Sequence, residues 1–267
     1  MSQVTVIEVP QWQGSGSRTA RRLVEGAGLL AAMVPNAARH RVEVADGDSP
    51  AAFAVTATRA RAAVDGVGDG LVVTVGGDCG VELAPVSAAL DRYGERLGLV
   101  WFDAHGDLNT PASSPSGAFH GMILRALTGE GHDELLPGRA ISPGRVVLAG
   151  ARDLDPGERG FIADSGLTHV TVAELSDPAI LVEAVAATGA EAVYVHIDLD
   201  VLDPGVFASV GSPAPGGLQP DHLLKLVAAL VERFEPAGLG ITEYEPVRLE
   251  DQTLLSPLIA TLVARAS

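Results

Sequence analysis

The sequence predicts an α/β fold, a three-layer α-β-α sandwich with a central, mainly parallel sheet of about eight strands. Short β-branched apolar runs alternate with longer amphipathic segments, and each apolar run breaks at Gly, Asp or Pro. Runs such as VVTVGG and LGLVWF lack polar alternation, as expected for central strands that helices cover on both faces. The chain has 267 residues and 47% hydrophobic content, so we expect a single domain over residues 1–267.

The elements follow one another in regular alternation along the chain. The apolar runs predict strands at residues 4–10, 41–45, 71–76, 97–103, 145–150, 168–172, 192–198 and 238–242. The amphipathic segments predict helices at residues 19–33, 51–64, 81–93, 121–127, 157–164, 178–187, 221–233 and 254–265. One long irregular segment, residues 107–121, is rich in Ser, Pro and Gly and directly follows charged residues at a strand end, which indicates a functional loop.

Composition excludes several classes of partner. Acidic residues outnumber basic ones by 34 to 18, a formal net charge of −16, and the basic residues are scattered, so we expect neither nucleic acid nor an anionic membrane as a partner. No apolar stretch is long enough to span a bilayer, and residues 1–10 lack the pattern of a secretory signal. The only cysteine, Cys79, cannot form an intramolecular disulfide. We therefore expect a cytoplasmic protein, and the single lysine, Lys225, suggests GC-rich bacterial coding.

Two motifs place acidic residues at the ends of apolar strands. WFDAHGD carries Asp103, His105 and Asp107 at i, i+2 and i+4, so in an extended chain all three point to one side. HIDLD repeats the arrangement with Asp198 and Asp200. In parallel α/β sheets the carboxyl ends of the strands form the crevice in which ligands bind. The two motifs are therefore expected to meet there.

Two further strand ends supply chemistry of the same kind. Asp78 and Cys79 follow the run LVVTVGG, and Glu243 ends the run before Pro246. Taken singly, a strand-end aspartate is more often a helix cap, and a lone buried cysteine is more often a small hydrophobe. Together, several carboxylates in one crevice repel one another unless they are protonated or neutralised by cations. The candidate ligand residues are more numerous than one ion can coordinate, which favours two divalent ions that share bridging aspartates.

The motifs resemble those of the arginase family of ureohydrolases. GGD, WFDAHGD, the HG of SGAFHG, HIDLDVLDP and a late Glu-x-x-Pro occur in that family's order and spacing, over about residues 71–246. The resemblance implies an arginase-like fold and a binuclear metal-dependent hydrolase acting on linear amidines. Related deacetylases share the general fold but use one zinc ion and lack the paired Asp-x-His-x-Asp and Asp-x-Asp motifs.

The resemblance also implies a set of metal ligands. One ion would be bound by Asp103, His105, Asp198 and Asp200, and the other by Cys79, Asp103, Asp107 and Asp198. Family members usually have histidine where Cys79 stands. Since a thiolate is softer than an imidazole, Cys79 favours Zn, Fe or Co, whereas the carboxylates suit Mn. Mn²⁺ is the first expectation, with the other three metals as alternatives.

Three residues are implied to take part in catalysis at the amidino carbon. Asp107 would hold and deprotonate a water that the two ions activate. Glu243 would pair with the cationic guanidinium group. His120, which lies 13 residues after Asp107 in SGAFHG, would pass a proton to the leaving amine.

The loops indicate which substrate the site would accept. The resemblance places Asn109 and Ser116 at the substrate α-carboxylate and Asp155 at its α-amino group, which favours a guanidino amino acid over agmatine. Two departures weaken this match, because Ala118 replaces a usual asparagine and Tyr-Glu replaces the usual Val-Asn after Glu243. L-Arginine and N-hydroxy-L-arginine, which would give ornithine plus urea or hydroxyurea, both fit.

Several alternatives stay open at this point. The cysteine, the histidine of HIDLD and the compact length are similar to the hydroxyarginine hydrolase of cycloserine biosynthesis, a divergent family member that lacks the loop histidine present here as His120. His196 itself would be either a partner of the metal ligands or a core histidine. The other functions considered are an arginase-like binding or sensing protein without catalysis and a hydrolase of another guanidino or formimidoyl substrate. Both a monomer and a homo-oligomer fit the sequence.

Overall fold

The computed structural model describes residues 3–267, and its strands form one sheet. The strands are β1 (Val4–Val9), β2 (Ala38–Arg41), β3 (Leu71–Gly76), β4 (Leu97–Phe102), β5 (Val146–Ala149), β6 (Thr168–Val170), β7 (Ala192–Asp198) and β8 (Glu235–Thr242). Their order across the sheet is β2-β1-β3-β8-β7-β4-β5-β6, and every neighbouring pair is parallel. The predicted eight-stranded parallel sheet is confirmed.

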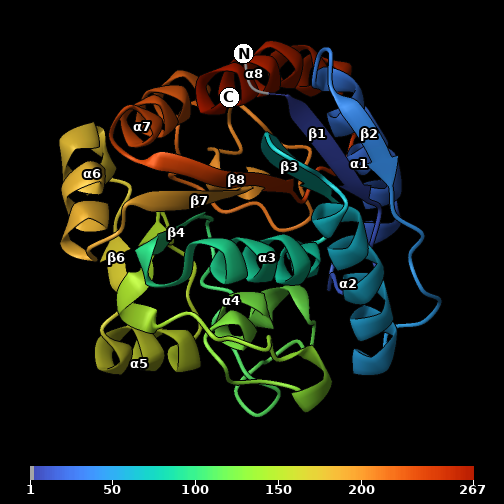
Figure 1. Cartoon of the computed structure of the whole chain (residues 1–267), viewed down its shortest axis with the longest axis horizontal. Helices are drawn as coiled ribbons and strands as arrows, with labels where there is room; N and C mark the ends of the chain where they lie inside the picture. The colour runs from blue at the N-terminus through green and yellow to red at the C-terminus, as the bar shows by residue number, and fades with distance from the viewer. Residues whose placement is uncertain (1–2) are drawn as a thin grey trace.

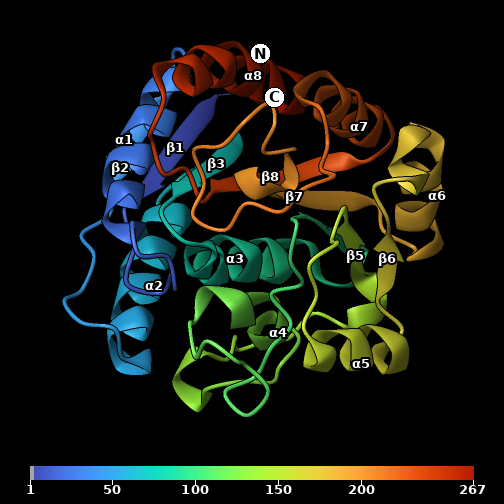
Figure 2. The same ribbon diagram turned by 180° about the vertical axis from the view of Figure 1, so that it is seen from behind.

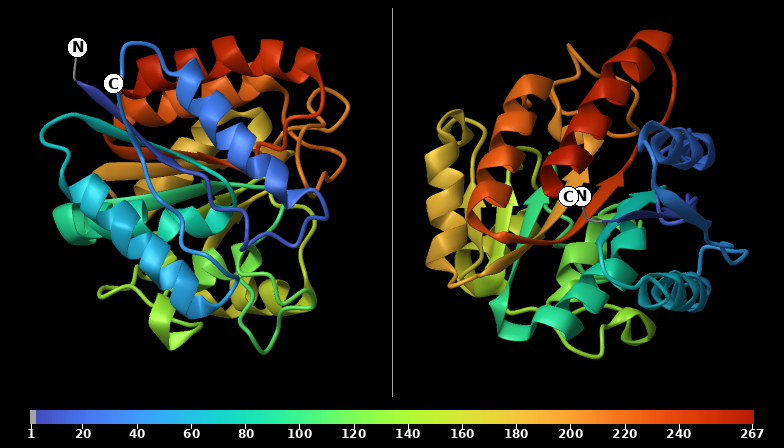
Figure 3. Two further views of the ribbon diagram at one scale, coloured as in Figure 1. Left: turned by 90° about the vertical axis from the view of Figure 1, so that its right-hand side faces the viewer. Right: turned by 45° about the horizontal axis from the view of Figure 1, so that its top comes forward.

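Helices cover both faces of the sheet (Figures 1 and 2). The helices are α1 (Leu23–Met33), α2 (Pro50–Asp65), α3 (Leu83–Tyr93), α4 (Ile123–Leu127), α5 (Pro156–Ser165), α6 (Pro178–Ala187), α7 (Pro220–Arg233) and α8 (Leu249–Ala266). One layer contains α1, α8, α7 and α6, which follow one another along the sheet, and the other contains α2, α3, α4 and α5 (Figure 3). This arrangement confirms the predicted three-layer sandwich.

Two neighbouring inner strands, β7 and β4, have every residue buried. Each face of the sheet contributes to a separate apolar cluster, one beneath α1, α6, α7 and α8 and one beneath α3 and α4. This double cover explains why LGLVWF shows no polar alternation in the sequence. Within residues 3–267 no helix is both long and apolar enough to cross a membrane.

Some element ends differ from the prediction. The second strand was expected at residues 41–45 but runs over Ala38–Arg41, where it pairs with β1 at the sheet edge. All four of its residues are exposed, so it has no apolar pattern to reveal it. The last strand starts at Glu235 rather than at residue 238, because its first residues pair with β7 before a register shift at Val193. The final helix starts at Leu249, five residues early.

The sheet order explains why distant motifs meet. Strands β3, β8, β7 and β4 are consecutive in space, although they lie far apart in the chain. Cys79 follows β3, Glu243 follows β8, Asp198 ends β7 and Asp103 follows β4. Because the strands are all parallel, these four ends lie at one edge of the sheet.

Helix α1 supports this edge through close packing. Gly26 lies so near the backbone of Tyr244, the residue after Glu243, that a Cβ atom on Gly26 would overlap the Tyr244 carbonyl. Gly28, on the same helix, has room, since a Cβ there would lie 3.6 Å from Glu8 Oε1. Gly26 therefore allows α1 to pack against the backbone next to Glu243, whereas Gly28 makes no such close contact.

This difference gives a paired prediction for α1. Gly28→Ala is expected to stabilise the protein by up to about 1 kcal/mol, because alanine favours a helix interior. Gly26→Ala gains the same propensity but must displace the Tyr244 backbone, so we expect a net loss of roughly 1–3 kcal/mol. Urea unfolding of the two variants measures both effects. Equal stability of the two variants would show that Gly26 does not hold the Glu243 segment.

Candidate metal centre

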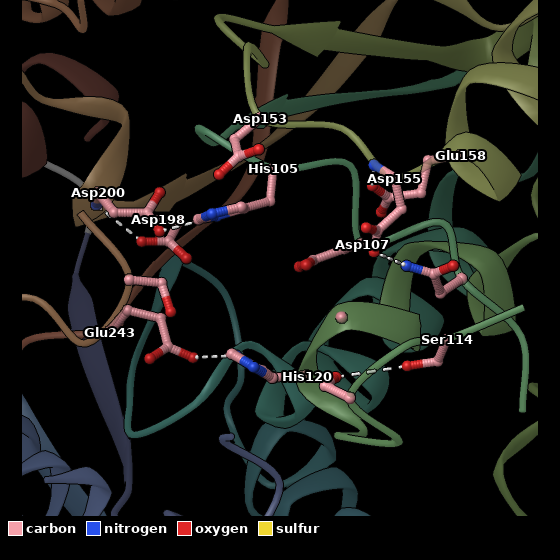
Figure 4. A pocket seen from close by; sticks show the side chains of 14 residues that line it. His105, Asp107, Ser114, His120, Asp153, Asp155, Glu158, Asp198, Asp200 and Glu243 are labelled. Carbon is pink, nitrogen blue, oxygen red and sulfur yellow. Dashed lines mark hydrogen bonds and ion pairs between the residues drawn. The ribbon is translucent and has the colours of Figure 1, made fainter. Parts of the chain in front are cut away.

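A cavity of about 160 Å³ opens at the carboxyl edge of the four central strands. Its lining residues are mostly polar and acidic: His105, Asp107, Asn109, Ser114, Ser116, His120, Gly121, Asp153, Asp155, Glu158, Asp198, Asp200, Ser212 and Glu243. Figure 4 shows His105 beside Asp198 and Asp200 on one side, with Glu243 paired to His120 on another. Of the eleven site residues predicted from the sequence, all line this cavity except Asp103 and Cys79, which are buried.

One group of possible ligands is centred on His105. Its Nδ1 lies 3.0 Å from Asp200 Oδ2 and 3.4 Å from Asp103 Oδ1. Asp103 and His105 are two residues apart in the extended chain after β4, so their side chains lie on the same side. Asp103 Oδ2 also accepts a hydrogen bond from Trp101 Nε1 at 3.1 Å. Asp103, His105 and Asp200 offer ligand atoms that all lie within 4.8 Å of one another.

The second group is centred on Cys79, which stands in the short 3-10 turn after β3. The Cys79 thiol donates to Asp198 Oδ2 at 3.2 Å, and Cys79 Sγ lies 3.2 Å from Thr242 Oγ1. Cys79 has ligand atoms within 4.8 Å of those of Asp198 and Glu243, and in a further combination within 4.8 Å of those of Asp103 and His196. Asp103 thus belongs to groups around both His105 and Cys79.

Asp107 reaches the cavity but joins none of these compact groups among residues 3–267. Its backbone has a φ of 53°, so the strand alternation that predicted its direction no longer applies at this residue. Its carboxylate atom Oδ2 is buried without a hydrogen-bond partner. A buried orphan carboxylate oxygen that faces other carboxylates is a natural place for a cation.

The pKa values of the buried carboxylates also favour a cation in this cavity. Burial raises the pKa of Asp198 well above its usual value, and Asp200 and Asp103 raise it further. Burial and then Asp103 raise the pKa of Asp107. Asp103 is the exception, because hydrogen bonds from His105 outweigh its burial and lower its pKa to about 2. So many carboxylates cannot all ionise in one place without added positive charge. The donor set therefore fits divalent metal ions.

Glu243 is held by two contacts to one oxygen. Its Oε1 accepts from the backbone N–H of Cys79 at 3.1 Å and lies 3.0 Å from His120 Nδ1. His120 Nε2 accepts from the N–H of Gly16 at 3.3 Å, so Nδ1 is the nitrogen that bears the proton and donates to Glu243. Burial alone would lower the pKa of His120, but the charge of Glu243 raises it. Glu243 Oε2 stays available to a cation in the cavity.

Asp78 has a structural role in this arrangement. Its carboxylate accepts hydrogen bonds from Gln11 Nε2 at 2.9 Å and from the N–H groups of Gly14 and Gly80 at 2.9 and 3.0 Å. Asp78 therefore ties the segment after β1 to the turn that presents Cys79. Of Asp78 and Cys79, which both follow β3, only Cys79 belongs to the groups of candidate ligands found in residues 3–267.

The predicted substrate residues form the far wall of the cavity. Asn109 Nδ2 donates to Asp155 Oδ2 at 2.8 Å, and Asn109 Oδ1 accepts from Ser113 Oγ at 2.9 Å. Ser116 is exposed at the cavity rim, where its hydroxyl accepts from the N–H of Ala118 at 3.2 Å. Asn109 and Asp155 thus form a linked pair, which was not predicted.

Other residues of the site were missed in the sequence. Glu158 is buried, and its two oxygens accept from the N–H groups of Leu108 at 3.1 Å and Asp155 at 2.8 Å, so it fixes the wall on which Asp155 stands. The Asp-Pro-Gly-Glu spacing of residues 155–158 is a helix-start signal that would have placed it. Asp153 also lines the cavity, although no motif reasoning singled it out.

Comparison with known proteins agrees with the motifs. The sequence profile of the arginase family matches residues 18–266. Arginase from Staphylococcus aureus is 41% identical over 154 residues, 55% of this chain and 51% of that protein, so the chain matches only about half the length of that relative. The crystal structure of arginase from Bacillus subtilis has a TM-score of 0.81 at 27% identity, covering 98% of each chain. Arginase from Entamoeba histolytica, solved in complex with L-ornithine, shares the fold with a TM-score of 0.87 at 24% identity and 98% coverage of each chain. The resemblance is confirmed, and the chain belongs to the arginase family.

Proposed function

We propose that the protein is a binuclear metal-dependent hydrolase that cleaves the amidino C–N bond of a guanidino amino acid. One observation supports this most strongly: carboxylates from the ends of β4, β7 and β8 converge with His105 on one small cavity. L-Arginine or N-hydroxy-L-arginine would give ornithine plus urea or hydroxyurea. The Staphylococcus aureus, Bacillus subtilis and Entamoeba histolytica relatives, all arginases, support this reaction class.

Two divalent ions would be held by the two groups that share Asp103. The His105 group would bind one ion, and Cys79 with Asp103 would bind the other, with Asp198 beside the Cys79 sulfur. Bound there, the ions would lower the pKa of a water molecule and so supply a nucleophile at neutral pH. The carboxylate majority suits Mn²⁺, while Cys79 also suits Zn, Fe or Co.

Glu243 and Asp107 would work on opposite sides of the reacting carbon. Glu243 Oε2 can form a charge-assisted hydrogen bond with the guanidinium group while Oε1 stays bound to the Cys79 N–H. Asp107 Oδ2, buried and without a partner, is placed to accept a proton from the attacking water. Both residues have left-handed backbone φ angles, 53° for Asp107 and 62° for Glu243. Strain of this kind typically collects at functional sites.

His120 would donate the proton to the leaving amine as an imidazolium and return to the neutral ring, since burial lowers the pKa of His120 but the charge of Glu243 raises it and so favours the charged form. Its Nδ1 proton faces Glu243 at 3.0 Å, so a guanidinium group that pairs with Glu243 comes within reach of the same proton. Gly16 holds the other ring nitrogen and keeps the ring in this orientation. The proton therefore moves over a short distance, from His120 to a nitrogen that Glu243 has already positioned.

The Asn109 and Asp155 pair would recognise the amino acid end of the substrate. Asp155 offers a negative charge to an α-amino group, while Ser116 at the rim offers a hydroxyl to a carboxylate. Asn109 keeps Asp155 in place through its 2.8 Å hydrogen bond. A substrate that lacks the amino group would lose the contact with Asp155.

The metal assignment is tested at the shared aspartate. Asp103→Asn is expected to lower bound metal below two ions per chain and to reduce kcat by at least about 100-fold, since the ions supply several kcal/mol of stabilisation. Asp153→Asn is the matched control, because Asp153 lines the cavity but belongs to none of the ligand groups in residues 3–267. Elemental analysis after reconstitution with Mn²⁺ gives the ion count. A two-ion count in Asp103→Asn would refute the assignment, and ligand binding without urea release by the Mn²⁺-loaded wild type would favour a sensing protein.

Substrate choice is tested at Asp155. Asp155→Asn is expected to lower kcat/KM for L-arginine by about 10- to 100-fold, because the neutral amide loses its charge attraction to the α-amino group. Turnover of 5-guanidinopentanoate, which lacks that group, is expected to change little. Steady-state assays of both compounds, with agmatine and N-hydroxy-L-arginine for comparison, measure the difference. An equal loss for L-arginine and 5-guanidinopentanoate would mean that Asp155 does not contact the amino group.

A further inference from the structure

A buried polar column lies directly behind the candidate metal centre. Tyr194, His196 and Asp198 alternate along β7 and so share one face of the sheet. Glu82, at the end of the turn that begins with Cys79, packs against the same face. Glu82 and His196 are both 0% exposed. Groups of this kind are costly to bury unless they are paired or bind a metal.

The neighbouring strand is shaped to hold this column. A Cβ on Gly238 of β8 would lie 2.6 Å from Tyr194 Cε2, and a Cβ on Gly240 would overlap the Glu82 carboxylate. Glycine weakens a strand interior and is expected there when another group must come close. Gly238 and Gly240 of β8 therefore make space for Tyr194 and Glu82, and any larger residue at position 240 would displace the Glu82 carboxylate.

The imidazole of His196 is fixed between Glu82 and Cys79. Its ring stacks on Trp101 with 3.6 Å between the ring centroids. Nε2 lies 3.7 Å from Cys79 Sγ, and Nδ1 lies 3.7 Å from Glu82 Oε2. Within residues 3–267, Nδ1 and both Glu82 oxygens have no hydrogen-bond partner. One ring nitrogen therefore points at the carboxylate and the other at the sulfur.

The spacing of these atoms suits a common metal ion. A sulfur at 2.3 Å and a nitrogen at 2.0 Å from one tetrahedral ion stand roughly 3.5 Å apart. The observed Sγ to Nε2 separation is 3.7 Å. A carboxylate oxygen of Asp103 completes a group whose atoms all lie within 4.8 Å of one another. Since Asp103 also belongs to the His105 group, it would be shared by the two ions.

We propose that His196 supplies a nitrogen ligand to the metal position at Cys79, and that Glu82 orients the His196 ring. The inference rests on the proposed metal-dependent function and adds two residues to it. Carboxylates that face the second nitrogen of a metal-bound histidine fix its orientation and strengthen binding. The paired sulfur and nitrogen make this position softer than the His105 position, so it favours Co²⁺, Zn²⁺ or Fe²⁺ over Mn²⁺.

Cobalt substitution tests the proposal without any assay of turnover. In Co²⁺-loaded protein, a sulfur-to-cobalt charge-transfer band in the near ultraviolet reports Cys79. Each metal-bound histidine adds one strongly shifted, solvent-exchangeable ring N–H signal to the proton NMR spectrum. We expect the sulfur band and two such signals in the wild type, from His105 and His196.

Three variants assign these signals. His196→Asn should keep the sulfur band, lose one ring signal and weaken Co²⁺ binding at this position about 10- to 100-fold. Glu82→Gln, which has the same size without the charge, should keep both signals, shift one of them and weaken binding about 10-fold. Cys79→Ser should lose only the sulfur band. The His105 signal, expected in all three, shows that each variant is folded.

The outcomes separate this inference from the proposed function. A sulfur band with a single ring signal in the wild type, or two ring signals that persist in His196→Asn, would overturn the role of His196 while the metal centre stands. If His196→Asn does not fold, the wild-type signal count and Glu82→Gln still decide the question. Failure of the wild type to bind Co²⁺ at all would overturn both the ligand assignment and the metal-dependent function.

Discussion

The mutual repulsion of buried carboxylates is the constraint on which the rest of this structure depends. Asp103, Asp107, Asp198, Asp200 and Glu243 are all at most 4% exposed, and they stand at the ends of adjacent strands. At a low local dielectric, like charges at such separations cost several kcal/mol each unless protons or cations offset them. The parallel order of the strands creates this crowding, which protons or bound cations must offset. The strand order that gathers these carboxylates therefore also creates the need to offset their charge.

The backbone around the centre reflects the same constraint. Asp107 and Glu243 both adopt left-handed conformations that cost about 1–3 kcal/mol each for residues other than glycine. Hydrogen bonds hold them there, from the Arg125 N–H to the Asp107 carbonyl and from the Glu243 N–H to the Gly77 carbonyl. Each bend turns a carboxylate into the cavity from a strand end that would otherwise point it elsewhere. The surrounding core supplies the energy that keeps both bends in place.

Much of the fold, and the convergence of the candidate ligands, could be predicted from the sequence, for a physical reason. Apolar runs and two-residue alternation are local, and they sufficed for every strand except the exposed edge strand β2 and for the common side of Asp103 and His105. The spatial order of the strands is not local, so the contact of His196 with Cys79 and the burial of Glu82 were beyond reach. Glu82 looks like an ordinary helix-start residue until Gly240, far along the chain, is seen to make room for it.

The segment after β1 belongs to the site although it offers no ligand. The Gly14 carbonyl accepts from the His120 N–H at 3.0 Å, and the Gly16 N–H binds the His120 ring, so this segment fixes both the backbone and the tautomer of that histidine. The segment is itself anchored to Asp78, the residue next to Cys79. One turn therefore positions the thiol on one side and, through Gly14, His120 on the other. A change at Cys79 must be accommodated together with the orientation of His120, because Asp78 links the two through the backbone.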